Sequence, residues 1–175
     1  DYREVKLDIR FLDSEAVCAA VEAGDLELGV VTLPLESSSA LAYEMVWDDP
    51  LAVVVGADHP LAGRRRVDMS RLATSAAILP AQETYTRQII EAAFREHHLA
   101  IETEVSTNYL ETIKMLVAVG LGWSLLPDSM LDGQVRRLSV KGLKLHRRLG
   151  IVHHRERTLS NAASAMIGTL RRHGD

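Results

Sequence analysis

The stretch LVAVGLGWSLLP, Leu116–Pro127, decides how the chain is organised. An apolar run meets Gly120 and Gly122, turns apolar again and stops at a proline. A Gly-x-Gly pair binds a nucleotide where a strand precedes it and a helix follows, because the start of that helix then faces the phosphates. Here residues 108–119 have the apolar spacing of a helix, and WSLL is short and apolar like a buried strand. The pair therefore joins a helix to a strand, and Gly120 takes the left-handed conformation that ends a helix.

Composition bounds the class of protein. The 175 residues suffice for one domain or two small lobes, and 47% are hydrophobic, as in an ordinary globular protein. The net charge of −4 argues against a nucleic-acid-binding surface on this chain, and no apolar run approaches the ~18 residues of a membrane span. A single cysteine, Cys18, forbids an intrachain disulfide and fits the reducing cytoplasm.

The first third of the chain predicts a crossover unit. VKLDIRFL, Val5–Leu12, alternates apolar and polar residues and predicts a strand with one solvent-facing side. A short helix over residues 14–23 and a strand over 26–31 follow with short joints, which is typical of parallel strands. Residues 41–47 and 51–56 predict two strands joined by a turn at 48–50.

The rest of the chain continues this alternation. We expect strands at AAILP, AIETEV, RRLSV and LGIVHH, and helices over residues 84–99 and 160–173. Asn108 and Glu111 form a plausible capping pair for the helix before Gly120. The pattern is mixed α/β with repeated crossovers.

Three of these pieces, taken in order, resemble one known family. They are DSEAVCAAVEAGDLELGVVT (Asp13–Thr32), WDDPLAVVVGADHPLAG (Trp47–Gly63) and IKMLVAVGLGWSLLPDSM (Ile113–Met130). The ordered set, which covers essentially the whole chain, resembles the effector-binding regulatory domain of LysR-type transcriptional regulators. The resemblance implies an α/β, two-lobed fold like that of type 2 periplasmic binding proteins, each lobe a mostly parallel sheet flanked by helices. Lobe I would be residues 1–76 plus 147–175, lobe II residues 77–146, with a cleft between them.

The resemblance also implies partners and a location. We expect a cytoplasmic protein that binds a small-molecule effector and needs no cofactor. Its regulatory domains would form an antiparallel homodimer, with the helix Ser14–Ala23 near a partner's helix Thr86–His97, and the full-length protein would be a tetramer. DNA would be bound only through an N-terminal winged helix-turn-helix domain that this sequence lacks.

The family's regulatory domain also begins with a strand and a helix that we do not find before Val5. Without that strand, lobe I would have a gap in its sheet between VKLDIRFL and LELGVV. Further N-terminal residues or segments exchanged between chains would fill the gap.

Candidate effector contacts lie where strands end and helices begin, since ligands of open parallel sheets bind there. The expected contacts are Thr32, Leu33, Pro80, Gln82, Glu83, Thr84, Tyr85, Thr86, Asn108 and Trp123. In the alternative interpretation, Thr32 only ends a strand, Thr84 or Thr86 only caps a helix, and Trp123 belongs to the core. A carboxylate effector would be repelled by Glu83 unless that side chain points to solvent, so the effector could instead be neutral or an amine.

Catalytic and metal-binding patterns are not found in the sequence. His97–His98 and His153–His154 are adjacent pairs, and neither the i, i+4 spacing of a helical metal site nor a Gly-x-Ser-x-Gly motif occurs. The basic triplet Arg64–Arg66 fits a solvated loop better than an anion site. The alternative function is a solute-binding protein or an enzyme on the same bilobed fold; an enzyme would need converging titratable groups, of which the expected contacts offer chiefly Glu83.

Overall fold

The computed structural model describes residues 5–174 and divides the chain into two compact units. Unit 1 combines Asp1–Asp48 with Arg148–Asp175, and unit 2 is Asp49–Arg147. Two strands, β2 (Leu41–Gly56) and β7 (Leu145–His154), contribute residues to both units.

The division differs from the predicted one at its first boundary, because residues 49–76 belong to unit 2 rather than to lobe I. The reason lies in pairing and packing. The second half of β2 pairs with β5 (Trp123–Pro127), and the following helix α2 (Met69–Ala73) contributes buried side chains to the same core as Trp123.

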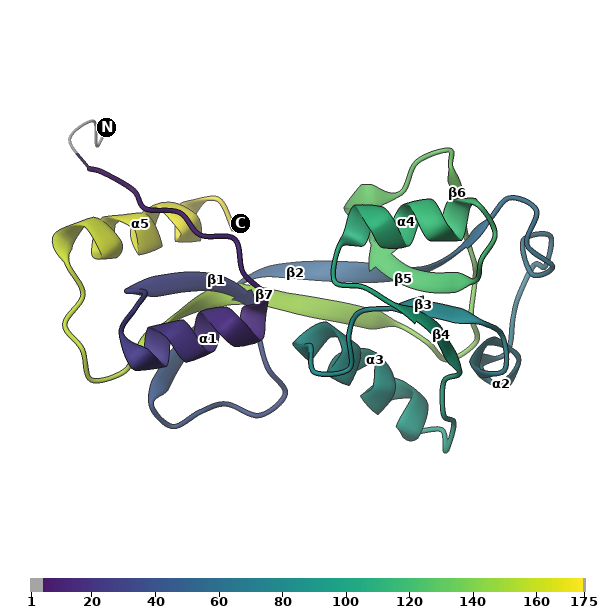
Figure 1. The fold of residues 1–175 in the computed structure, drawn as a ribbon, viewed down its shortest axis with the longest axis horizontal. Helices are drawn as coiled ribbons and strands as arrows, with labels where there is room; N and C mark the ends of the chain where they lie inside the picture. Colours follow the sequence, from purple (N-terminus) through teal and green to yellow (C-terminus); the bar gives the residue numbers. More distant parts are fainter. Residues whose placement is uncertain (1–4, 175) are drawn as a thin grey trace. The chain divides into compact units, whose positions relative to one another are not determined.

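Unit 1 is built around an antiparallel pair of strands. β1 (Leu28–Thr32) pairs with β7, from Leu28 opposite His153 to Thr32 opposite Leu149. Two helices, α1 (Ser14–Ala23) and α5 (Asn161–Arg172), lie on opposite faces of these strands (Figure 1). The neighbouring residues Ile151 and Val152 point to opposite faces and are both fully buried, which agrees with cover on both sides.

The predicted strand VKLDIRFL is wrong for this structure. Residues 5–12 form no strand, and their apolar side chains are exposed, Phe11 to 94%. Strand β1 ends the described sheet, so no described residue pairs with its outer edge. A strand over residues 5–12 would need a neighbour to satisfy its N–H and C=O groups, and the gap predicted in this sheet leaves it none. The parallel pairing expected between VKLDIRFL and β1 is therefore not formed, and β1 pairs with β7 in the antiparallel sense instead.

The predicted turn at residues 48–50 is absent, and β2 runs through it as one strand. Pro50 can lie in an extended chain, and pairing of β2 with β5 begins one residue later, so the missing N–H removes no rung of that ladder. The carboxylate of Asp49 accepts a hydrogen bond from Arg147 at 2.6 Å, and both side chains are largely buried. Extended backbone thus replaces the turn that Asp and Pro favour.

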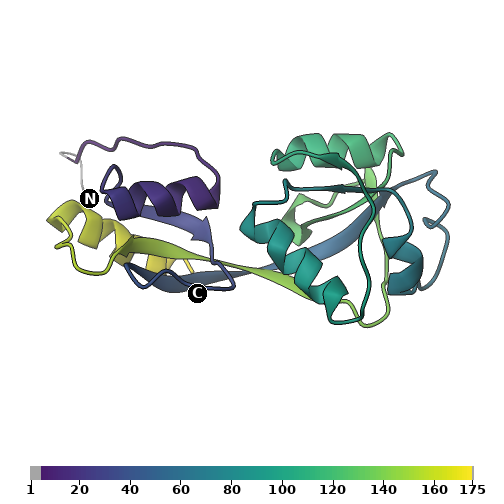
Figure 2. The same ribbon diagram turned by 60° about the horizontal axis from the view of Figure 1, so that its bottom comes forward.

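Unit 2 has a mixed sheet with helices on both faces (Figures 1 and 2). It contains the second half of β2, α2, β3 (Ala77–Leu79), α3 (Tyr85–Arg95), β4 (Thr103–Ser106), α4 (Leu110–Ala118), β5, a 3-10 helix η1 (Asp128–Met130), β6 (Val135–Arg137) and the start of β7. β3 is parallel to β4 and β5, whereas β2 is antiparallel to β5 and β6. One core cluster contains side chains from α2 and α3, and a second contains side chains from α4.

The prediction for the glycine pair is confirmed. Helix α4 ends at Ala118, Gly120 has a φ of +88°, and β5 begins at Trp123. A Cβ on Gly122 would lie 2.4 Å from the carbonyl oxygen of Ala76, so this glycine is required by a close approach of two backbones. The pair connects a helix to a strand and presents no helix N-terminus to a phosphate.

Candidate functional site

One edge of unit 2 collects two strand ends and two helix starts. The parallel strands β3 and β4 align Leu79 with Ser106, so both strands end at the same edge. A short turn follows each strand, after which α3 and α4 begin. Such an edge offers hydroxyl, amide and backbone N–H groups to a ligand.

Asn108 connects the two turns. Its Oδ1 accepts a hydrogen bond from the Ala81 N–H at 2.8 Å, and the neighbouring Thr107 N–H donates to the Leu79 carbonyl at 3.1 Å. The predicted capping role of Asn108 is wrong, since Tyr109 occupies the N-cap of α4 without a side-chain hydrogen bond. Asn108 holds the first turn in place instead of starting the second helix.

Thr84 is the N-cap of α3, as in the alternative interpretation, in which it caps a helix and does not contact a ligand. Its hydroxyl accepts from the Arg87 N–H at 3.2 Å and donates to the Ala81 carbonyl at 2.8 Å. The hydroxyl proton is therefore already used within the protein, and Thr84 is 7% exposed. Thr84 is thus poorly placed to contact a ligand directly.

The remaining predicted residues of this turn differ in exposure. Pro80 is buried, Gln82 and Glu83 are exposed, and Tyr85 and Thr86 are partly buried at the start of α3. The exposed Glu83 agrees with the interpretation in which its side chain reaches solvent. Gln82, Glu83 and Thr86 therefore offer the accessible polar side chains of this turn.

Arg87 is the residue of this site that the sequence interpretation missed. Its guanidinium donates to Glu91 at 2.7 Å, to the Pro80 carbonyl at 3.2 Å and to the Thr103 hydroxyl at 2.7 Å, although the residue is only 6% exposed. It thereby fixes the end of β3, the start of α3 and the start of β4. The signal was available, because Arg87 lies three residues before the inward Ile90, on the apolar stripe of the helix.

Trp123 does not belong to this edge. It is fully buried, stacks on Phe94 with ring centres 5.8 Å apart, and donates its indole N–H to the Ser75 carbonyl at 3.0 Å. Strand pairing places Trp123 opposite Ala77, at the amino end of the parallel strands. The candidate contacts lie at the carboxyl end, so the core interpretation is the correct one.

Thr32 and Leu33 lie at the corresponding carboxyl end of β1 in unit 1. The Thr32 N–H donates to the Ser14 hydroxyl at 2.9 Å, and the Leu33 N–H donates to the Arg148 carbonyl at 2.8 Å. Thr32 is 6% exposed, and its hydroxyl forms no hydrogen bond with the described residues. The first turn of α1 and the end of β1 are thus held together, as α3 and β3 are in unit 2.

Within residues 5–174, no three His, Cys, Asp or Glu side chains gather in a way that could hold a metal ion. The same residues contain no helix with the length and apolar character to cross a lipid bilayer.

Comparison with known proteins identifies the family. The model of the LysR substrate binding domain matches residues 1–175. The chain belongs to this family. A RuBisCO operon transcriptional regulator of Allochromatium vinosum is 30% identical over 166 residues, which cover 92% of this chain and 54% of the regulator. An uncharacterised HTH-type transcriptional regulator, YeiE, of Escherichia coli K12 is 29% identical over 93% of this chain and 56% of its own length. This LysR domain therefore spans about half the length of these relatives.

Solved structures share the fold of the LysR domain. The Synechocystis CcmR regulatory domain in complex with 2-PG aligns with a TM-score of 0.87 and 22% identity, covering 99% of this chain and 86% of that one. The effector-binding domain of QuiR in complex with shikimate aligns at 0.83 and 21%, covering 93% and 78%. The C-terminal domain of a probable LysR-family regulator from Rhodococcus aligns at 0.80 and 26%, covering 97% and 85%. The family model over the whole chain makes this chain an effector-binding domain of the LysR family.

Proposed function

We propose that this LysR domain is the sensor of a cytoplasmic transcription regulator, and that a small polar effector binds at the carboxyl edge of β3 and β4. The observation that carries the proposal is the anchored turn at residues 80–84, tied to Asn108 on one side and to Arg87 on the other. An ordered turn of this kind presents its polar groups without first losing conformational entropy on binding. Thr32 and Leu33 are the equivalent groups of unit 1, and we propose them as effector contacts on the same grounds.

The effector acts through a population shift. It binds one arrangement of the protein more tightly than another, and it biases the regulator by at most that difference in affinity. In the full-length protein, the DNA contacts would come from an N-terminal domain that is outside this sequence.

A ligand screen followed by calorimetry tests the proposed contacts. The panel contains 2-PG, shikimate and small carboxylates, amines and neutral polyols, and a shift in melting temperature selects binders. Thr32→Ala and Thr86→Ala are each expected to weaken the selected ligand by about three- to tenfold, the equivalent of one lost hydrogen bond. Thr74→Ala is the matched control, because the Thr74 hydroxyl bonds only carbonyls of its own helix, Ser70 and Arg71.

The Thr84 variant separates capping from contact. Thr84→Ala is expected to lower the free energy of unfolding by about 1 kcal/mol through loss of the N-cap. Its affinity, measured on folded protein, is expected to change less than that of the Thr86 variant. The contact assignment fails if a ligand binds and the Thr32, Thr86 and Glu83 variants all keep the original affinity.

The charge of the effector can be read from Glu83. Glu83→Gln removes an exposed negative charge beside the turn, so it is expected to tighten an anionic ligand and weaken a cationic one. Glu96→Gln removes an equal exposed charge at the opposite end of α3 and serves as the control.

We also propose a homodimer of regulatory domains, with α1 of one chain near α3 of the other, and a tetramer of the full-length protein. The outer face of α1 supports this proposal, because Ala16, Ala19 and Ala23 are exposed at helical spacing and leave room for a second helix. Sedimentation at tens of micromolar, roughly the affinity range of such contacts, is expected to show a dimer. A monomer at that concentration would contradict it.

A further inference from the structure

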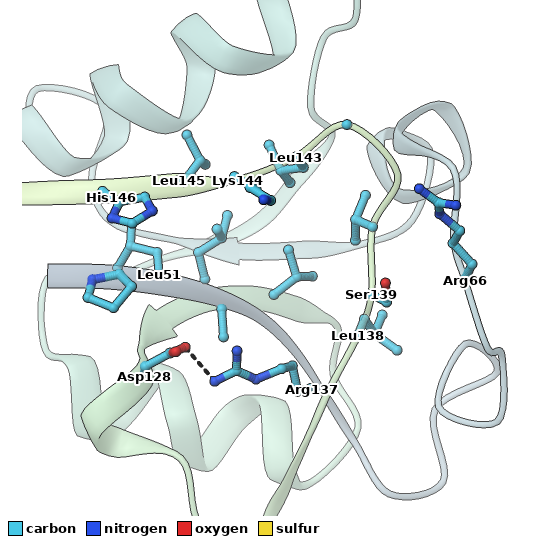
Figure 3. Close-up of a pocket in the computed structure, with 16 residues that line it drawn as sticks. Leu51, Arg66, Asp128, Arg137, Leu138, Ser139, Leu143, Lys144, Leu145 and His146 are labelled. Atoms are coloured by element: carbon cyan, nitrogen blue, oxygen red, sulfur yellow. Dashed lines mark ion pairs between the residues drawn. The ribbon is translucent and has the colours of Figure 1, made fainter.

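A hollow of about 590 Å³ lies on unit 2 beside β2, away from the residues proposed as effector contacts (Figure 3). Its volume falls within the range of small-molecule sites, about 300–1,000 Å³. The apolar part of its lining consists mainly of Leu51, Val53, Leu125, Leu138, Leu143 and Leu145. All of its lining residues belong to unit 2, so the hollow is complete within one compact unit.

Backbone hydrogen bonds hold the wall of this hollow. After β6 the chain leaves the sheet, and the Leu138 N–H donates to the Val53 carbonyl at 2.8 Å. Val67 then binds the segment that follows Leu138 through two backbone hydrogen bonds. Its N–H donates to the Ser139 carbonyl at 2.9 Å, and its carbonyl accepts from the Lys141 N–H at 2.9 Å. The wall is therefore formed before any ligand arrives.

The charges around the hollow are mostly positive. Arg66, Arg137 and Lys144 line it, and Asp128 is its one acidic lining residue. Asp128 is already engaged by Arg137 at 2.7 Å. Arg66 and Lys144 form no ion pair with the described residues, although the chain as a whole has a net charge of −4. Two cations without an ion-pair partner at one hollow of a negatively charged chain favour the binding of an anionic ligand there.

We propose that this hollow binds a small amphipathic carboxylate, whose apolar body lies on the leucines and whose negative charge is attracted by two cations of the lining, Lys144 and Arg66. An apolar lining with a few cationic groups at its border is the usual composition of a site for such a molecule. The proposal gives a role to one member of the basic triplet, since Arg66 lines the hollow while Arg64 and Arg65 do not. None of its residues is an effector contact proposed above, so it stands or falls independently of that site.

Octanoate is the probe for this site, with 1-octanol as the neutral match and acetate as the isolated headgroup. Titration into the ¹⁵N-labelled 175-residue chain is expected to shift the amide signals of Leu51, Ser139 and Leu143 saturably, with a Kd of about 1 mM or below. Arg66→Gln and Lys144→Gln are each expected to weaken octanoate by about three- to tenfold. Arg65→Gln is the matched control and is expected to leave the affinity unchanged.

Ser139→Trp gives an independent steric test. Ser139 is exposed on the wall, so an indole there fills the hollow without entering the core, and octanoate binding is expected to disappear while the melting temperature is kept. Four results would overturn the proposal: no saturable shift, equal affinity for octanol and octanoate, shifts confined to residues 80–86, or equal weakening by the Arg65 and Arg66 variants.

Discussion

At the scale of single residues, the two glycines that join α4 to β5 are required for different reasons. A Cβ on Gly120 would meet no atom within 4 Å, so Gly120→Ala is penalised only by the positive φ, at about 1–2 kcal/mol. A Cβ on Gly122 would press on the Ala76 carbonyl, which also accepts the Trp123 N–H at 3.0 Å. Gly122→Ala is therefore expected to lower the free energy of unfolding by about 2–4 kcal/mol. Urea denaturation of both variants measures the difference, and equal losses would contradict the close approach.

The position of Trp123 leads to a second residue-scale prediction. Trp123→Phe keeps an aromatic ring beside Phe94 but loses ring volume and the hydrogen bond to the Ser75 carbonyl. We expect a loss of about 1–3 kcal/mol in the free energy of unfolding and no change in effector affinity. Denaturation and calorimetry on the same variant check both parts. A variant of unchanged stability with weakened effector affinity would indicate that Trp123 contacts the effector.

The candidate site shows what sequence reasoning can and cannot reach. Local order along the chain was sufficient to find the turn before α3, because a turn depends on neighbouring residues, but it left open whether Thr84 or Thr86 caps the helix or contacts a ligand. Ala81, the hydrogen-bond partner of Asn108, is 27 residues away. Whether Trp123 lies near the candidate site depends on which end of the parallel strands it pairs with. Arg87 was missed because a charged residue on a helix is ordinarily exposed, and because two of its acceptors, the Pro80 carbonyl and the Thr103 hydroxyl, lie outside its own helix.

At the scale of elements, strands were the least predictable part of the fold. Alternation of apolar residues made VKLDIRFL a plausible strand, but a strand also needs a neighbour, which the pattern does not contain. Conversely, Asp48–Pro50 has the composition of a turn, but it is extended in the structure. The hydrogen bond from Arg147 to Asp49 that accompanies this extended form joins residues 98 apart, so the local sequence does not contain it. Helices α1, α3, α4 and α5 fall within the predicted segments because their signals are local.

The attachment of α5 to β2 is expected to depend on pH. Arg171 of α5 holds the carboxylate of Glu44 with two hydrogen bonds of 2.5 and 2.6 Å, and this lowers the pKa of Glu44 below its ordinary value of 4.5, against a smaller opposing effect of burial. The folded state thus favours the charged carboxylate. Its stabilising contribution is present above the ordinary pKa and is lost as the pH falls through the lowered one.

Glu44→Gln tests this attachment. The variant is expected to be slightly less stable at neutral pH, and its stability is expected to fall less steeply in acid, between about pH 5 and about pH 3. The effect is small because Arg171 and Glu44 are 59% and 38% exposed, and salt is expected to reduce it further. Urea midpoints across this range measure the slopes, with Glu36→Gln as the control. Identical slopes for Glu44→Gln and the unchanged protein would contradict a stabilising pair.

At the scale of the whole molecule, the core residues within unit 2 predict that this unit folds alone. The segment 49–147 contains both core clusters with all of their buried members. A fragment of these residues is expected to show dispersed amide signals and a cooperative melting transition. The shorter fragment 77–146, which follows the boundary expected from sequence, lacks the β2 strand and is expected to stay unfolded. A folded 77–146 fragment would show that β2 is dispensable for this core.

Unit 1 is assembled from both ends of the chain, which has a consequence for synthesis. β1 leaves the ribosome early, but β7, its partner, follows only after the whole of unit 2 has been made. At about 5–20 residues per second, the delay is roughly 5–20 s. During that interval unit 2 can acquire its native core, while β1 and α1 wait for the strand that completes them. The core of unit 2 is therefore expected to form in the nascent chain before β1 and β7 of unit 1 can pair.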